Sequence, residues 1–157
     1  MEPDLLWDEV RELFDPELGH LPDVYVSSTT SEDWQRVVDL VRTSGMSYQC
    51  REDGRSVDLP AHVGAILDRQ DATMELWVWP APEVLAIFRF SSVDEIDFDV
   101  DLRELQGQDR LDVLCGFLRA IGREVGKPVL VVAEGSRYPL VGYDPVADTV
   151  SRAAQAW

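Results

Sequence analysis

Four carboxylates stand at alternate positions between residues 95 and 101, and large apolar side chains separate them. The carboxylates are Glu95, Asp97, Asp99 and Asp101, and the apolar residues are Ile96, Phe98, Val100 and Leu102. Because side chains of a strand point alternately to its two faces, this spacing predicts a strand with one apolar and one acidic face. Aspartate is disfavoured in strands, so local propensity does not explain a row of three.

Three kinds of chemistry suit such a row. A solvated acidic face would discourage edge-to-edge aggregation of the sheet. A docking surface would attract a basic protein. A divalent-metal or two-carboxylate catalytic site would use Asp97, Asp99 and Asp101. Alternating carboxylates alone do not specify a metal geometry, and no histidine lies nearby in the sequence. We therefore predict neither a metal site nor catalytic residues here.

The remaining reactive residue types form no recognisable constellation. His20 and His62 are the only histidines, and the spacing of histidines and cysteines is not that of a zinc site. Cys115 falls on the apolar stripe of a predicted helix, which favours packing over nucleophilic catalysis, and Cys50 is best interpreted as a buried thiol. The segment 122–128 lacks the glycine spacing of a phosphate-binding loop. No cofactor is predicted.

Trp77 and Trp79 form a second candidate site, since they share one face of a predicted strand and alternate with Leu76 and Val78. Tryptophan is common both in cores and among the residues that dominate protein interfaces. Core packing and contact with a partner are therefore both open. If helices cover only one face of the sheet, one of these two pairs must be at least partly exposed.

The charge of the chain limits its partners. Thirty acidic and fourteen basic residues give a net charge of −16, which should repel nucleic acid and anionic membranes and favour basic proteins or cations. The acidity is uneven, because residues 108–157 hold six acidic and six basic residues whereas residues 74–107 hold eight and two. Solubility alone does not require such a skew, which favours a specific acidic surface.

The elements that must position these residues predict one α+β domain over 1–145, with a largely antiparallel sheet and helices mainly on one face. Thr30 and Asp33 have capping-box spacing, Asp53-Gly54 is a hairpin signal, and Gly126 with Pro128 ends the last helix. We expect Asp109 to cap that helix. The predicted helices are 3–14, 30–43 and 109–125, and the predicted strands are 24–26, 46–51, 56–59, 74–79, 84–90, 95–102, 129–133 and 138–143.

Two expectations concern the ends and the location of the chain. Residues 146–157 are expected to be a loosely held tail, although Trp157 could dock. The acidic N-terminus lacks the basic start and apolar stretch of a secretory signal, and no segment is long and apolar enough to span a membrane. The expected location is the cytoplasm.

In its size, acidity, α+β pattern and carboxylate row at 95–101, the chain resembles bacterial immunity proteins, which bind and neutralise a cognate toxin. The segments 21–26 and 143–145 are also similar to segments of uncharacterised actinobacterial proteins, a resemblance that implies no activity. The resemblance to immunity proteins implies a basic, nuclease-type toxin as partner.

We therefore predict a non-enzymatic module that binds a basic protein, with no role for nucleic acid or membrane. Its expected contact residues are Glu95, Asp97, Asp99, Asp101, Trp77 and Trp79. Two alternatives stay open: a small divalent-metal-dependent enzyme that uses the three aspartates, and a subunit or adaptor of a larger complex. The sequence makes no prediction of oligomeric state.

Overall fold

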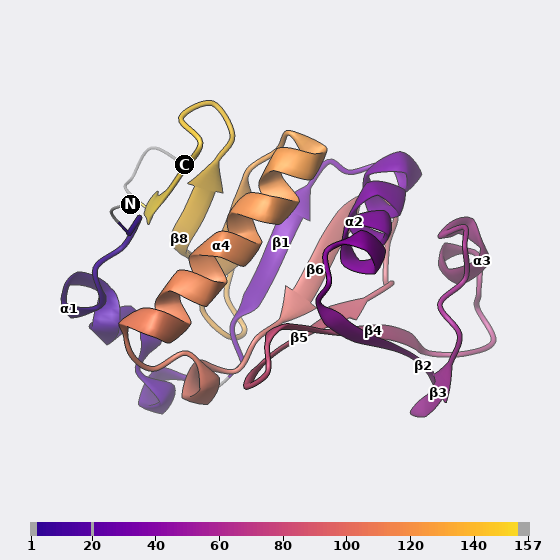
Figure 1. Ribbon diagram of the computed structural model, residues 1–157, viewed down its shortest axis with the longest axis horizontal. Helices are drawn as coiled ribbons and strands as arrows, with labels where there is room; N and C mark the ends of the chain where they lie inside the picture. Colours follow the sequence, from indigo (N-terminus) through magenta and orange to yellow (C-terminus); the bar gives the residue numbers. More distant parts are fainter. Residues whose placement is uncertain (1–2, 20, 154–157) are drawn as a thin grey trace.

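Over the part of the chain that the structure describes, the fold is a nine-stranded antiparallel sheet with its two long helices on one face, as the computed structural model shows (Figure 1). The structure describes residues 3–19 and 21–153. The strand order across the sheet is β3-β2-β4-β5-β6-β1-β7-β8-β9. The predicted α+β class, antiparallel sheet and one-sided helix layer are confirmed. Within the described residues, no helix is both long enough and apolar enough to cross a membrane.

The elements follow the predicted order closely. The strands are β1 (Asp23–Ser27), β2 (Ser47–Glu52), β3 (Arg55–Val57), β4 (Met74–Ala81), β5 (Val84–Arg89), β6 (Glu95–Asp99), β7 (Val129–Val132), β8 (Pro139–Asp144) and β9 (Thr149–Arg152). The helices are α1 (Trp7–Val10), α2 (Ser31–Thr43), α3 (Gly64–Leu67) and α4 (Gln108–Val125), with short 3₁₀ turns η1 (Arg11–Phe14), η2 (Pro16–Leu18) and η3 (Leu102–Glu104).

Helices α2 and α4 lie next to each other over the sheet (Figure 1). The predicted capping box begins α2, since Thr30 accepts a hydrogen bond from the Asp33 backbone and Asp33 accepts one from the Thr30 backbone. Gly126, with φ of 65°, ends α4 in the left-handed conformation that glycine adopts without strain. The expected cap at Asp109 is wrong, because Gly107 takes the N-cap position and Asp109 lies in the first turn.

The core lies between the helices and the sheet face beneath them. Phe88 of β5 and Phe98 of β6 are fully buried with ring centroids 4.5 Å apart, and Phe117 of α4 packs edge-on against Phe98 at 5.4 Å. Burial alternates strictly along β5 and β6 and along β4 as far as Trp79. Every second side chain of these strands therefore faces the helices, and the others face away from them.

Two predicted elements are several residues shorter in the structure. The expected helix 3–14 is split, because α1 ends at Val10 and the chain continues as the 3₁₀ turn η1. The expected strand 95–102 ends at Asp99, after which the chain turns into η3. In both places a 3₁₀ turn replaces the regular element and itself contains a residue buried in the core, Phe14 in η1 and Leu102 in η3.

The segment expected to be a loose tail contains the last strand. Residues 149–152 pair with β8, and Val150 is buried in the core. Arg152 also forms an ion pair of 2.6 Å with Glu12. Backbone pairing and burial therefore hold this part of the expected tail in the domain. Trp157 lies outside the described residues.

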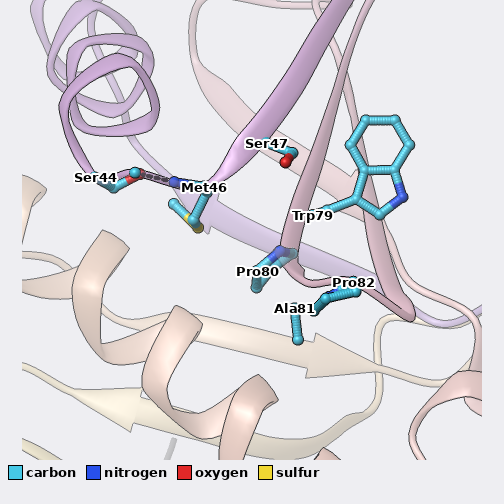
Figure 2. Close-up of a pocket in the computed structure, with 8 residues that line it drawn as sticks. Ser44, Met46, Ser47, Trp79, Pro80, Ala81 and Pro82 are labelled. Carbon is cyan, nitrogen blue, oxygen red and sulfur yellow. Dashed lines mark hydrogen bonds between the residues drawn. The ribbon is translucent and has the colours of Figure 1, made fainter.

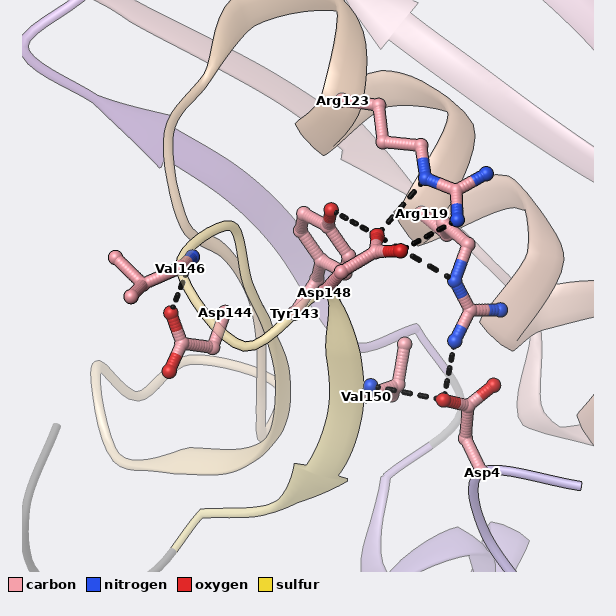
Figure 3. A network of polar contacts seen from close by, with 8 residues as sticks. All are labelled: Asp4, Arg119, Arg123, Tyr143, Asp144, Val146, Asp148 and Val150. Atoms are coloured by element: carbon pink, nitrogen blue, oxygen red, sulfur yellow. Dashed lines mark hydrogen bonds and ion pairs between the residues drawn. The ribbon is translucent and has the colours of Figure 1, made fainter.

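A polar cluster fastens this C-terminal hairpin to α4 (Figure 3). The Asp148 carboxylate accepts hydrogen bonds from the Tyr143 hydroxyl at 2.6 Å and from Arg123 at 2.8 and 2.5 Å. Arg119 lies between Asp148 and Asp4, and its Nε is 3.8 Å from Asp148. The buried Tyr143 ring packs directly on α4, where Gly122 leaves room for it.

Candidate protein-binding face

The sheet face turned away from the helices carries the predicted carboxylates. Directly paired residues share a sheet face, so the registers define which side chains lie side by side. One cross-strand row runs Arg51, Glu75, Arg89, Asp97, Tyr25 and Leu130. The next row runs Gln49, Trp77, Ile87, Asp99 and Asp23. The face is thus mixed: the second row has Trp77 and Ile87 on β4 and β5 and carboxylates on β6 and β1, whereas the first row has Glu75 on β4 between two arginines and Tyr25 on β1.

We call five carboxylates on this side the acidic face: Asp23, Glu75, Glu95, Asp97 and Asp99. They come from β1, β4 and β6 and are only partly exposed; the side chains of Asp99 and Glu95, for example, are 17% and 30% exposed. Asp23 stands directly opposite Asp99, and such pairs have Cβ atoms about 5 Å apart. Five negative charges are therefore crowded on three strands.

Asp101 does not continue the row of carboxylates on β6. Because the strand ends at Asp99, Asp101 caps η3, where its carboxylate accepts a hydrogen bond from the Arg103 backbone at 2.9 Å. It also forms an ion pair of 2.7 Å with the Arg103 side chain. The predicted row of four is therefore a row of three in β6, and Asp101 has a structural role at its end.

Two arginines partly neutralise the acidic face. Arg89 of β5 binds Glu75 at 2.5 Å and Asp99 at 2.7 Å. Arg137, in the loop between β7 and β8, binds Glu95 at 2.6 Å, and its Cζ lies 4.7 Å from the centre of the Tyr25 ring. Within the described part of the chain, no hydrogen bond or ion pair reaches the Asp97 carboxylate. The carboxylates thus outnumber the cations.

Partial burial and the excess of negative charge raise the pKa values of two of these carboxylates. Burial, and then the neighbouring charges of Glu95 and Asp99, raise the pKa of Asp97 to about 6. Burial, and then the adjacent Asp99 carboxylate, raise the pKa of Asp23 to about 6. Arg89 and Arg137 oppose the shift at Asp97 without cancelling it. Both carboxylates therefore carry their charge at neutral pH at a cost to the folded state.

The tryptophans lie on this same side of the sheet. Leu76 and Val78 are fully buried beneath the helices, whereas Trp77 and Trp79 are half-buried on the opposite face. Core packing for the tryptophans is therefore wrong, and the expected partial exposure of one pair is confirmed. The Arg51 guanidinium lies 3.7 Å from the Trp77 ring centre, and the two indole rings are 6.1 Å apart. Their contact with a partner stays a prediction.

An open pocket of about 730 Å³ lies beside Trp79, between the start of β2 and the β4–β5 hairpin. Figure 2 shows Met46 and Pro80 on one side of it and the Trp79 ring pointing away from them. Serines, glycine, prolines and apolar side chains line the pocket, and none of the lining residues carries a charge. Its lining therefore offers apolar contact area and lacks the charged groups that would orient an ionic ligand.

Residues suited to metal binding or covalent chemistry are not brought together in the described ranges. No group of three or more histidine, cysteine, aspartate or glutamate side chains there is placed to hold a metal ion. Cys50 and Cys115 are buried free thiols, and burial raises the pKa of Cys115 to about 12, which makes it a poor nucleophile. His62 is exposed, and His20 lies outside the described residues.

Sequence reasoning missed Asp23, Tyr25, Arg89 and Arg137. The alternation Asp23-Val24-Tyr25-Val26 is the same kind of signal as the one at 95–101, and it could have placed Asp23 and Tyr25 on an exposed strand face. Arg137 lies 42 positions from Glu95 along the chain, and only the strand order brings the two together. No local pattern marks that contact.

Comparison of the chain with protein-family profiles, curated protein sequences and solved structures finds no significant match. What the protein does is therefore inferred from its own geometry and charge.

Proposed function

We propose that this protein is a non-enzymatic module that binds a basic protein through the acidic face and the tryptophans beside it. The observation that carries the proposal is the imbalance on this face: two arginines form ion pairs with three of its five partly buried carboxylates, and the pKa values of the other two, Asp23 and Asp97, are raised to about 6. A cationic partner would relieve this repulsion and gain charge-assisted hydrogen bonds.

The mixed character of the face also suits a protein partner. Trp77, Trp79 and Ile87 offer apolar area next to the carboxylates, and protein interfaces combine aromatic anchors with polar groups in this way. Two of the aromatic rings, Trp77 and Tyr25, already have an arginine of the same chain stacked on them. The rings are therefore oriented to accept cations.

A basic nuclease-type toxin is the partner that we favour, in keeping with the resemblance to immunity proteins. Nucleases carry basic surfaces because they bind phosphates, and an acidic face can occupy such a surface in place of nucleic acid. The net charge of −16 would also speed the encounter at low salt. Membership of a larger complex as an adaptor is the alternative that uses the same face.

The proposal is tested by affinity capture from the native host with three immobilised forms of the protein. The test variant is Asp23→Asn/Asp97→Asn, which removes two charges from the acidic face. The matched control is Asp112→Asn/Glu124→Gln, which removes two charges from the exposed side of α4 on the other side of the sheet. Circular dichroism checks that all three are folded.

We expect one basic protein to be retained by the wild type and the control and reduced about tenfold with the test variant in low salt. A toxin-like nuclease among the retained proteins supports the immunity role, whereas a stable set of several subunits supports the adaptor role. If all three forms retain the same proteins in the same amounts, the acidic face is not the binding surface.

A further inference from the structure

The loop of residues 133–138 places the Arg137 side chain over the acidic face. It joins β7 to β8, yet Arg137 reaches over β1 to bind Glu95 on β6, with Nη1 and Nη2 at 2.6 and 3.3 Å from the two carboxylate oxygens. Gly135, with φ of 70°, allows the turn. The Arg137 side chain is 68% exposed, so the core does not hold it in place. Its contacts are those of a surface cation bound to a carboxylate and an aromatic ring.

A pocket of about 240 Å³ lies under this loop. Asp23, Tyr25, Glu95, Asp97, Ser136 and Arg137 line it together with Gly135. Pockets for small ligands are typically larger, about 300–1,000 Å³, so the size fits a single side chain better than a cofactor. Two of its carboxylates have raised pKa values, and one side is a tyrosine ring with a guanidinium over it.

We propose that this pocket binds an arginine side chain of the partner. In the free protein Arg137 occupies the position of that arginine, and it is displaced when the partner binds. The inference rests on the proposed function and names the group that the acidic face recognises. A guanidinium of the chain itself already binds Glu95 and stacks on Tyr25. Asp97 and Asp23 lie beside it, so a partner guanidinium that takes this position gains contacts that Arg137 does not use.

Arginine is favoured over lysine for two physical reasons. Its planar guanidinium binds carboxylates in a bidentate manner, and it stacks on aromatic faces, whereas the ammonium of lysine is a strongly hydrated point charge. Tyr25 lies between Asp97 on β6 and Leu130 on β7 in the cross-strand row, and it provides the stacking surface. The preference for arginine should therefore depend on Tyr25.

Fluorescein-labelled octa-arginine and octa-lysine peptides serve as probes, and fluorescence anisotropy at low ionic strength gives their affinities. Arg137→Gln removes the guanidinium that occupies this position. Arg36→Gln is the matched control, because Arg36 is also exposed and also pairs with a glutamate, but it lies on α2 on the other side of the sheet. Both substitutions change the net charge equally.

We expect Arg137→Gln to tighten octa-arginine binding about fivefold and Arg36→Gln to tighten it less than about twofold. In the wild type octa-arginine should bind more tightly than octa-lysine, and Tyr25→Leu should remove the difference. Equal tightening by both arginine variants, weaker binding by Arg137→Gln, or equal affinity of the wild type for the two peptides would overturn the inference.

The Asp23→Asn/Asp97→Asn variant separates this inference from the proposed function. If it binds octa-arginine as tightly as the wild type, the acidic face itself is not the cation-binding surface and both proposals fail. If it binds more weakly while Arg137→Gln behaves like Arg36→Gln, the acidic face stands and only the role of Arg137 fails.

Discussion

Two clusters of carboxylates and arginines in this molecule differ in the balance between negative and positive groups. In the C-terminal cluster, Asp148 has Arg123 bound to it, Arg119 beside it and the Tyr143 hydroxyl donating to it (Figure 3). On the acidic face carboxylates are in excess, since the ion pairs of Arg89 and Arg137 reach only three of the five, Glu75, Asp99 and Glu95.

The protonation equilibria of the two regions shift in opposite directions. Hydrogen bonds from Arg123, and then from Tyr143, hold the pKa of Asp148 well below its usual range. Burial and neighbouring charge raise the pKa of Asp97 to about 6. The cluster therefore stabilises the fold at neutral pH, whereas Asp97 weakens it. A carboxylate that costs stability is better explained by binding than by folding.

The largest effect is expected where the C-terminal hairpin packs on α4. A Cβ at Gly122 would lie 2.1 Å from the Tyr143 ring, and Gly122 and Tyr143 are both buried. Gly122→Ala therefore forces the hairpin away from the helix. We expect the free energy of unfolding in urea to fall by about 2–3 kcal/mol.

Gly116 on the same helix is the control, because nothing lies within 4 Å of the Cβ that an alanine would add there. Gly116→Ala should raise stability by about 0.5–1 kcal/mol through helix propensity. Similar effects of the two substitutions would show that Tyr143 does not pack against Gly122 as described.

A smaller effect of opposite sign is expected on the acidic face. The pKa of Asp97 is about 6 in the folded state, and the ordinary aspartate value of 3.8 applies in the unfolded chain. The folded protein therefore binds more protons than the unfolded chain between about pH 4 and 6. Its stability therefore falls as the pH rises through this window. Asp97→Asn should raise the free energy of unfolding at pH 7 by about 1–2 kcal/mol, with little difference at pH 4.

Asp148→Asn is the matched control for this pH series. Since the pKa of Asp148 is lowered in the folded state, its contribution to stability is complete above the ordinary aspartate pKa. This contribution is lost as the pH falls through the pKa of Asp148 in the folded protein. This variant should be less stable than the wild type at pH 7, and the difference should shrink in acid. If Asp97→Asn also lowers stability at pH 7, the contrast between the two regions is refuted.

Much of the fold was predictable because its signals are local. The alternation at 95–99, the capping box at Thr30 and the glycine at 126 each act within a few residues, and the structure contains all three as expected. The end of β6 and the position of β9 were not predictable, because they depend on where Leu102 and Val150 find burial in a core assembled from distant segments.

The candidate site was predictable in part for the same reason. Asp97 and Asp99 were placed on one strand face by local alternation, whereas Asp101 left the row because the strand stopped two residues earlier. The pairing of β1 with β6 puts Asp23 opposite Asp99, and the loop between β7 and β8 brings Arg137 to Glu95. Such contacts follow from strand order, which no local pattern encodes.

Cations should bind the acidic face specifically and not the acidic chain in general. The direct test is a titration of ¹⁵N-labelled wild-type protein with octa-arginine, followed residue by residue in ¹H–¹⁵N correlation spectra. We expect the largest shift changes in β1, β6 and the 133–138 loop. Equal or larger changes in residues 3–19, which are also strongly acidic, or along α2 and α4, would contradict the claim.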